Sequence, residues 1–127
     1  MTKNLTIKLD PENRLIIEIL KGEITLKDLV ECQSKMINNP EFSDSYYTLL
    51  DIRGAVFNFT KFDKIRFSVF LRDIATNFNL DRKCAIVTNS PEEVVSSIIF
   101  QKVMRAVSPL KIKIFSTIEA ALEYLKY

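Results

Sequence analysis

The chain has 127 residues, of which 47% are hydrophobic and 27% are charged, and its formal net charge is +2. This length and composition predict one soluble globular domain over residues 1–127. The small net charge and the lack of a long basic run argue against a nucleic-acid partner. Because the chain contains no histidine, a Ser–His–Asp or Cys–His catalytic site within it is excluded.

The two cysteines, Cys32 and Cys84, form neither a zinc-ligand pattern nor a C-x-x-C motif. We expect two reduced thiols in a cytosolic protein and predict no metal and no cofactor. The opening residues MTKNLTIKLD lack the apolar core of a signal peptide, and no stretch has the roughly 18 apolar residues that a membrane span needs. We therefore expect a cytoplasmic protein with no transmembrane segment.

The chain is expected to begin with a β-hairpin. Residues 4–9 alternate apolar and polar side chains, and residues 14–20 are mostly apolar, so both stretches predict strands. Residues 10–13, Asp-Pro-Glu-Asn, have the composition of a turn between them. The sequence Lys-Gly-Glu at 21–23 is expected to end the second strand.

A helix and a central strand are expected next. Thr25, with Asp28 three positions later, predicts an N-cap for a helix over about 25–38. Residues 46–52 form an apolar run that predicts a strand covered on both faces. Thr60 and Asp63 form a second possible capping pair, opening a helix over about 60–78.

The last part of the chain repeats the alternation of strand and helix. Residues 82–88 predict a strand, and Ser90-Pro91 with Glu93 predicts the start of a helix that runs to about 107. A strand is expected at 111–115. Ser116 and Glu119 predict a final capping box before the last helix.

The predicted order is therefore ββαβαβαβα. Strands that alternate with helices after an opening hairpin imply one mixed five-stranded sheet with right-handed crossovers, packed with about four helices. No pair of carboxylates is placed as an acid/base couple, and no glycine-rich phosphate loop is present. We therefore expect a protein that is not an enzyme.

Four stretches resemble one known family: GEITLKDL (22–29), PEFSDSYYTLLDIRG (40–54), RKCAIVT (82–88) and IKIFSTIEAALEYL (112–125). In their order and spacing the chain resembles the STAS family, the domain shared by sulphate transporters and anti-sigma-factor antagonists. It is most similar to the small stand-alone bacterial branch grouped with the CRAL-TRIO lipid-binding fold. The resemblance covers nearly the whole chain and implies a STAS-like fold in a non-catalytic interaction module.

The resemblance also implies a place for partner binding. In the antagonists of the family, the loop after the third strand and the start of the next helix meet a partner kinase, and a Ser or Thr there accepts phosphate. Counting from Asp51, that position falls on Thr60. Phe59 replaces the acidic residue that precedes the acceptor in the family, and Lys61-Phe62 replaces the Ser/Thr-Gly pair. Thr60 is therefore either a phospho-acceptor or a plain N-cap.

Asp51 ends the expected central strand. It can accept backbone N–H groups of a turn at 53–55, in which Gly54 reverses the chain, or it can pair with Arg53. Ligands of open α/β sheets bind near the carboxyl ends of strands, so Asp51 is also a candidate binding residue.

Six of the nine phenylalanines fall in one segment, at Phe57, Phe59, Phe62, Phe67, Phe70 and Phe78. A helix that is apolar around most of its girth is buried on more than one face. One face of this helix packs against the sheet. Three alternatives are open for what buries its other apolar surface: the domain's own third helix, a second subunit, or an apolar ligand or membrane surface. The basic residues of the segment, Lys61, Lys64, Arg66 and Arg72, suit an acidic partner or an anionic lipid headgroup, and equally a solvated helix face.

These observations favour a regulatory or interaction module that binds a protein partner, including a second copy of itself, through residues 53–67. The alternative is a module that binds an apolar or lipid-like small ligand between helix 60–78 and its neighbours. The candidate binding residues are Asp51, Arg53, Gly54, Phe57, Phe59, Thr60, Phe62, Lys64 and Phe67. The identity of the partner or ligand does not follow from the sequence.

Overall fold

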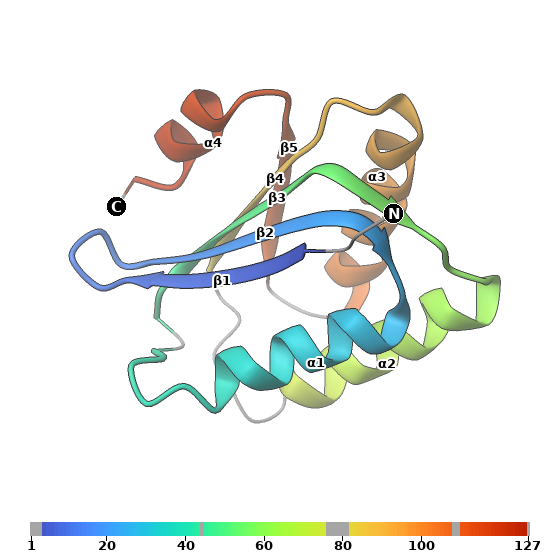
Figure 1. Ribbon diagram of the computed structural model, residues 1–127, viewed down its shortest axis with the longest axis horizontal. Helices are drawn as coiled ribbons and strands as arrows, with labels where there is room; N and C mark the ends of the chain where they lie inside the picture. The colour runs from blue at the N-terminus through green and yellow to red at the C-terminus, as the bar shows by residue number, and fades with distance from the viewer. Residues whose placement is uncertain (1–3, 44, 76–81, 108–109, 127) are drawn as a thin grey trace.

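The computed structural model describes residues 4–43, 45–75, 82–107 and 110–126. It has an α/β fold with one five-stranded sheet, whose strands lie in the order β1-β2-β3-β4-β5 (Figure 1). The elements are β1 (Asn4–Asp10), β2 (Leu15–Ile24), α1 (Leu26–Ile37), β3 (Tyr47–Phe57), α2 (Lys61–Ala75), β4 (Lys83–Val87), α3 (Pro91–Val107), β5 (Lys111–Phe115) and α4 (Ile118–Tyr124). This order confirms the predicted ββαβαβαβα arrangement.

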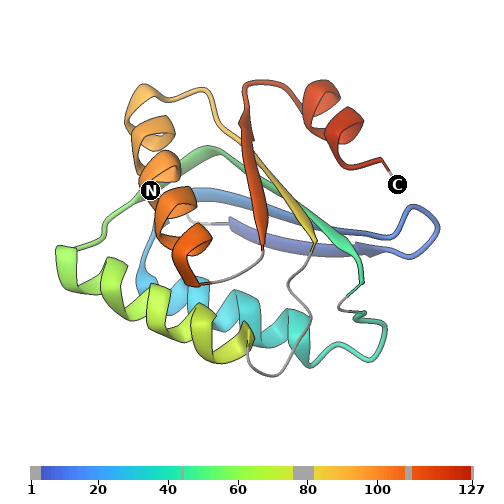
Figure 2. The same cartoon turned by 180° about the vertical axis from the view of Figure 1, so that it is seen from behind.

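Helices cover both faces of the sheet. β1 is antiparallel to β2, and the other strands are parallel to their neighbours. Because each crossover joins two adjacent parallel strands, α1, α2 and α3 all lie on one face, and α4 folds back onto the other (Figures 1 and 2).

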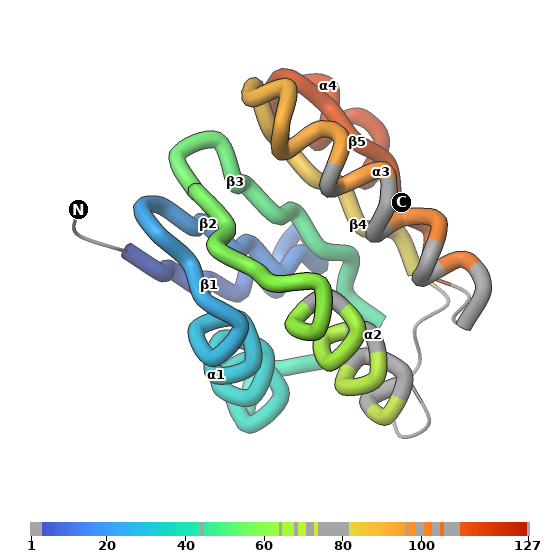
Figure 3. The backbone as a smooth tube through the Cα atoms, turned by 90° about the vertical axis from the view of Figure 1, so that its right-hand side faces the viewer, coloured from blue at the N-terminus to red at the C-terminus, as the bar shows by residue number. Residues whose placement is uncertain are grey.

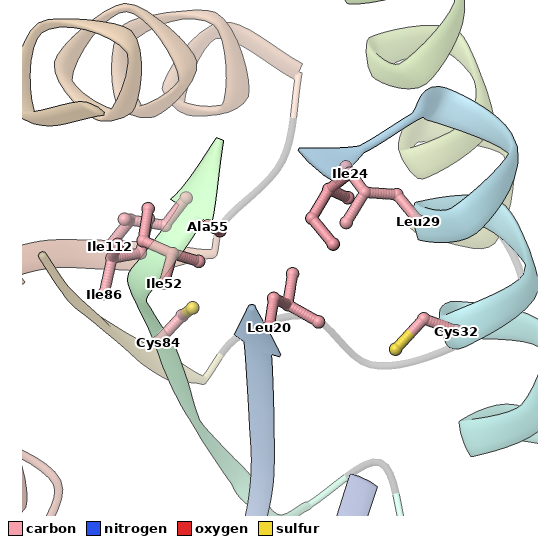
Figure 4. Packing of buried hydrophobic residues seen from close by; sticks show 9 residues of the cluster. All are labelled: Leu20, Ile24, Leu29, Cys32, Ile52, Ala55, Cys84, Ile86 and Ile112. Atoms are coloured by element: carbon pink, nitrogen blue, oxygen red, sulfur yellow. The ribbon is translucent and has the colours of Figure 1, made fainter. Parts of the chain in front are cut away.

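Each face has its own hydrophobic core. The core under α1, α2 and α3 contains Leu20, Ile24, Leu29, Cys32, Ile52, Ala55, Cys84, Ile86 and Ile112 (Figure 4). The smaller core under α4 contains Leu15, Leu49, Ala85, Val87, Ala121 and Leu125. The alternation of side chains along β3 and β4 divides these residues between the two faces, as a sheet covered on both sides requires.

β2 and β3 are longer than the sequence predicts. The expected break at 21–23 is wrong, because β2 continues to Ile24 with Gly22 at a φ of 84°. The expected turn at 53–55 is wrong as well, because β3 continues to Phe57. In both places the neighbouring strand supplies the pairing that overrides the local turn signal.

An irregularity in the pairing of β2 with β3 gives β3 one extra residue. Ile19 pairs with Asp51, and the next pair is Lys21 with Gly54, which is the geometry of a β-bulge. β4 ends at Val87, opposite Asp51, and the pairing of β1 with β2 ends at Lys21, opposite Gly54. Beyond these points β2 and β3 continue as a two-stranded ribbon. Figure 3 shows that both strands bend in the same direction at this end of the sheet. β2 then leads into α1, and β3 leads into the segment before α2.

The predicted capping boxes are confirmed for α1 and α2. Thr25 N–H donates to Asp28 Oδ2 at 2.9 Å, and Asp28 N–H donates to Thr25 Oγ1 at 3.3 Å. For α4 the predicted cap is wrong by one residue. Thr117, not Ser116, is the N-cap, and its Oγ1 accepts from Ala120 N at 3.2 Å. Serine and threonine are both favoured N-cap residues, so the local sequence does not separate the two positions. The expected end of the second helix at 78 lies outside the described residues.

Candidate functional site

The outer side of α2 carries three exposed apolar side chains. Phe62 is 71% exposed, Ile65 is 55% exposed and Val69 is 41% exposed. Their spacing of three and four residues places them on one helix face. We call these three residues the α2 stripe. On α3, Val95 and Ile98 form a shorter exposed apolar pair, 58% and 39% exposed.

Three other phenylalanines of the segment face inward. Phe57, Phe59 and Phe67 are partly buried and pack against the core under α1, α2 and α3. The rings of Phe57 and Phe59 are 5.4 Å apart, and those of Phe67 and Phe70 are 6.3 Å apart. Phe57, Phe59 and Phe67 therefore contribute to core packing, whereas Phe62 belongs to the exposed surface of α2. Phe78 lies outside the described residues.

Thr60 stands at the start of α2 with the hydrogen bonds of an N-cap. Its Oγ1 accepts from Asp63 N at 3.1 Å, and its N–H donates to Asp63 Oδ2 at 3.0 Å. The residue is exposed and lies two positions before Phe62, the first residue of the α2 stripe. The phospho-acceptor role of Thr60 remains a prediction. The intact mass of protein from its native cells, before and after phosphatase treatment, tests it.

Positive charge lies beside the stripe. Lys61 is exposed, and Arg66 is 74% exposed with its Nη1 4.0 Å from Asp63 Oδ1. This exposed ion pair is worth little to stability, so the Arg66 guanidinium is available to a partner. The side chains of Lys64 and Arg72, which were expected to belong to the same basic rim, lie outside the described part of the structure.

Asp51, Arg53 and Gly54 lie at the bulge of β3. Asp51 Oδ1 accepts from Arg53 N at 3.1 Å and from Arg53 Nε at 2.9 Å, and Asp51 Oδ2 accepts from Arg53 Nη2 at 2.9 Å. Hydrogen bonds from the guanidinium lower the pKa of the Asp51 carboxyl, although burial opposes this shift. The predicted pairing with Arg53 is thus present, whereas the predicted turn is not.

The Asp51–Arg53 pair faces the opposite side of the sheet from the inward-facing phenylalanines. Leu49, two residues before Asp51, belongs to the core under α4. Glu119 on α4 is close enough to Arg53 to interact with it electrostatically. Phe57 packs instead against the core under α1, α2 and α3. The candidate residues therefore do not form one site: Asp51 and Arg53 lie on the α4 side, and Thr60 and Phe62 lie on α2.

One unusual residue was missed in the sequence. Glu18 is only 3% exposed and points into the core beneath α1, where its Oε1 accepts from Gln33 Nε2 at 3.1 Å. Burial raises the pKa of Glu18 to about 7, against the opposing effect of the Arg82 charge. The available signal was the single charged residue inside the apolar run LIIEIL, residues 15–20, at a position whose neighbours Ile16 and Leu20 share its face.

No protein-family model matches the sequence, and a comparison with curated proteins finds no significant match. Among solved structures, the chain is similar to an uncharacterized protein of the DUF3478 family with a SpoIIAA-like fold from Shewanella loihica PV-4. The two share 18% sequence identity with a TM-score of 0.54, over 97% of this chain and 93% of that chain.

This likeness establishes the class of fold. The chain has a SpoIIAA-like, that is STAS-like, α/β fold, as its resemblance to the STAS family implied. In the described residues, no helix is both long and apolar enough to cross a membrane. The same residues contain no group of three or more acidic, cysteine or histidine side chains placed to hold a metal ion.

Proposed function

We propose that the chain is a non-catalytic regulatory module that binds a protein partner through the α2 stripe and the start of α2. The observation that carries the proposal is the 71% exposure of Phe62 on the same helix face as exposed Ile65 and Val69. Single exposed apolar residues are ordinary, but a row of three on one helix face is typical of an interaction surface. Aromatic residues are also the commonest anchors of such surfaces.

Two further observations support this proposal. The STAS-like fold places α2 directly after the central strand, and the resemblance described above gives this segment the partner contact in related antagonists. Exposed Lys61 and Arg66 lie beside the stripe, so an acidic rim on the partner would be complementary to it. The partner that fits best combines an apolar groove with surrounding carboxylates.

Phe62→Asp tests the proposal, with Leu122→Asp as its matched control. Leu122 is 38% exposed on α4, so the control places the same charge on an exposed apolar position of the opposite face. If Phe62 is an anchor, its replacement should weaken partner binding or self-association by 30-fold or more, the effect of losing about 2 kcal/mol. Leu122→Asp should leave the affinity unchanged.

Two measurements give the readout. Sedimentation velocity over a range of concentrations reports self-association, and a photo-crosslinking amino acid at position 62 or 122 captures a partner in the native cells. The proposal predicts a defined adduct from position 62 and none from position 122. A concentration-independent monomer that also gives no adduct at position 62 contradicts it. A lipid-like mass bound to the monomer in native mass spectrometry would instead favour the ligand alternative.

A further inference from the structure

A groove of about 550 Å³ lies at the β5 edge of the sheet, between α3 and α4. Figure 2 shows β5 between these two helices, and it is the outermost strand at this edge among the residues that the structure describes. The described lining residues are Lys83, Gln101, Arg105, Leu110, Lys111, Ile112, Lys113 and Tyr124. The volume falls within the range of about 300–1,000 Å³ that is usual for small-molecule sites. None of these residues belongs to the α2 stripe.

The groove is strongly basic. Four of its described lining residues carry positive charge, namely Lys83, Arg105, Lys111 and Lys113, and none carries negative charge. Lys83 Nζ and Lys113 Nζ each lie 5.0 Å from the centre of the Tyr124 ring, so one aromatic ring gathers two ammonium groups. Lys83 Nζ also donates to the Tyr124 carbonyl oxygen at 3.0 Å, which holds its ammonium group at the groove wall.

Lysines on an edge strand also discourage pairing with other chains, and an extended acidic peptide could in principle add to such an edge. In this protein, a side chain already occupies part of the outer edge of β5. The Lys111 N–H bonds to the Arg82 carbonyl oxygen on the β4 side, so the backbone groups of the next residue, Ile112, face the open edge, and Gln101 Nε2 donates to the Ile112 carbonyl oxygen. An added strand would have to displace this bond, whereas a small anion at the lysine and arginine head groups would leave it intact.

We propose that this groove is a binding site for a small anion with two or more phosphate or carboxylate groups. The lysine ammonium groups and the Arg105 guanidinium supply charge-assisted hydrogen bonds, and the guanidinium can bind an oxyanion through two parallel bonds. Tyr124 and Leu110 supply the apolar wall on which the carbon part of an organic anion would rest.

The test titrates the purified ¹⁵N-labelled chain with pyrophosphate and, separately, citrate, with acetate as a monovalent control. Amide shifts at Gln101 and residues 111–113 should saturate at one equivalent of pyrophosphate or citrate, and acetate should give no saturable shift. Arg105→Gln and Lys113→Gln should each weaken binding about tenfold, the usual effect of removing one charge-assisted hydrogen bond. Whichever probe binds more tightly identifies the preferred group.

Lys8→Gln is the matched control, because Lys8 is an exposed lysine on β1, the other edge strand of the sheet. It should leave the affinity unchanged, and thermal unfolding checks that each variant is folded. Three outcomes would overturn the proposal: shifts spread over all lysines without saturation, equal affinities for the groove variants and Lys8→Gln, or binding of an acidic peptide but of neither small anion. A failure here would leave the role of the α2 stripe unaffected.

Discussion

Asp51 and Glu18 are carboxyl groups on adjacent strands whose surroundings shift their pKa values in opposite directions. The guanidinium of Arg53 bonds to both oxygens of Asp51 and lowers its pKa. Glu18 lies on the other face of the sheet, where burial is the largest influence and raises its pKa from 4.5 to about 7. The Gln33 amide and the Arg82 charge favour its ionised form but do not offset the lost hydration.

This arrangement makes Glu18 a source of pH-dependent stability. Its raised pKa means that the folded chain binds the proton more tightly than the unfolded chain does. The resulting stabilisation is complete below the unfolded pKa of 4.5 and is lost as the pH rises through about 7. Glu18→Gln keeps an acceptor for Gln33 and cannot ionise.

The free energy of unfolding of Glu18→Gln, relative to that of the unmodified protein, should therefore increase by up to about 3 kcal/mol between pH 4 and pH 8. Urea unfolding at intervals across this range measures the difference. A difference that stays constant with pH would show that Glu18 titrates at the same pH in the folded and unfolded chains.

At the level of elements, the β2–β3 ribbon depends on the chain's two glycines in different ways. Gly22 is buried and has a φ of 84°, which a residue with a side chain adopts only at a cost. At Gly54 an added Cβ would meet only the flexible Lys21 side chain, with Cγ at 3.2 Å. Lys21 is exposed and can move away.

Gly22→Ala should consequently lower the free energy of unfolding by about 1–2 kcal/mol, and Gly54→Ala should lower it by less. Urea denaturation of the two variants side by side gives the comparison, in which each is the control for the other. The reverse order would mean that the ribbon tolerates strain at Gly22 but not crowding beside Lys21.

The elements and their order could be predicted from the sequence because caps and hydrophobic periodicity are local signals. Thr25 with Asp28 and Thr60 with Asp63 are examples, since each pair is complete within four residues. The extra length of β2 and β3 could not be predicted in this way. Residues 21–23 and 53–55 read locally as turns, and only the facing strand makes them extended.

The candidate site was predictable only in part for a similar reason. The segment with Phe62 and Phe67 was recognised as too apolar for one buried face, but an almost uniformly apolar helix does not reveal which ring points outward. The structure exposes Phe62 and directs Phe67 inward. Glu18 was missed because its partner, Gln33, lies fifteen residues away on α1.

At the scale of the whole molecule, the two free thiols report on a shared core. Cys32 on α1 and Cys84 on β4 are both buried and belong to the same hydrophobic cluster (Figure 4). Burial raises the pKa of each thiol to about 12, so little reactive thiolate is present in the folded chain at pH 8.

If α1 and the sheet separate only in global unfolding, both thiols should react with a disulfide reagent at one common slow rate. This rate should rise with urea as steeply as global unfolding does. Cys32→Ala and Cys84→Ala leave one thiol each and allow the two rates to be compared. A much faster reaction of Cys32 would show that α1 detaches from the sheet by itself.

The spatial order of the strands is also their order along the chain. Every strand after the first therefore forms beside a strand that the ribosome has already made, and no early strand must wait for a distant later one. α4 comes after all five strands and covers Leu49, Ala85 and Val87. During synthesis these side chains would be the last of the interior to be shielded from water, and chaperones that recognise exposed apolar surface would have their longest opportunity there.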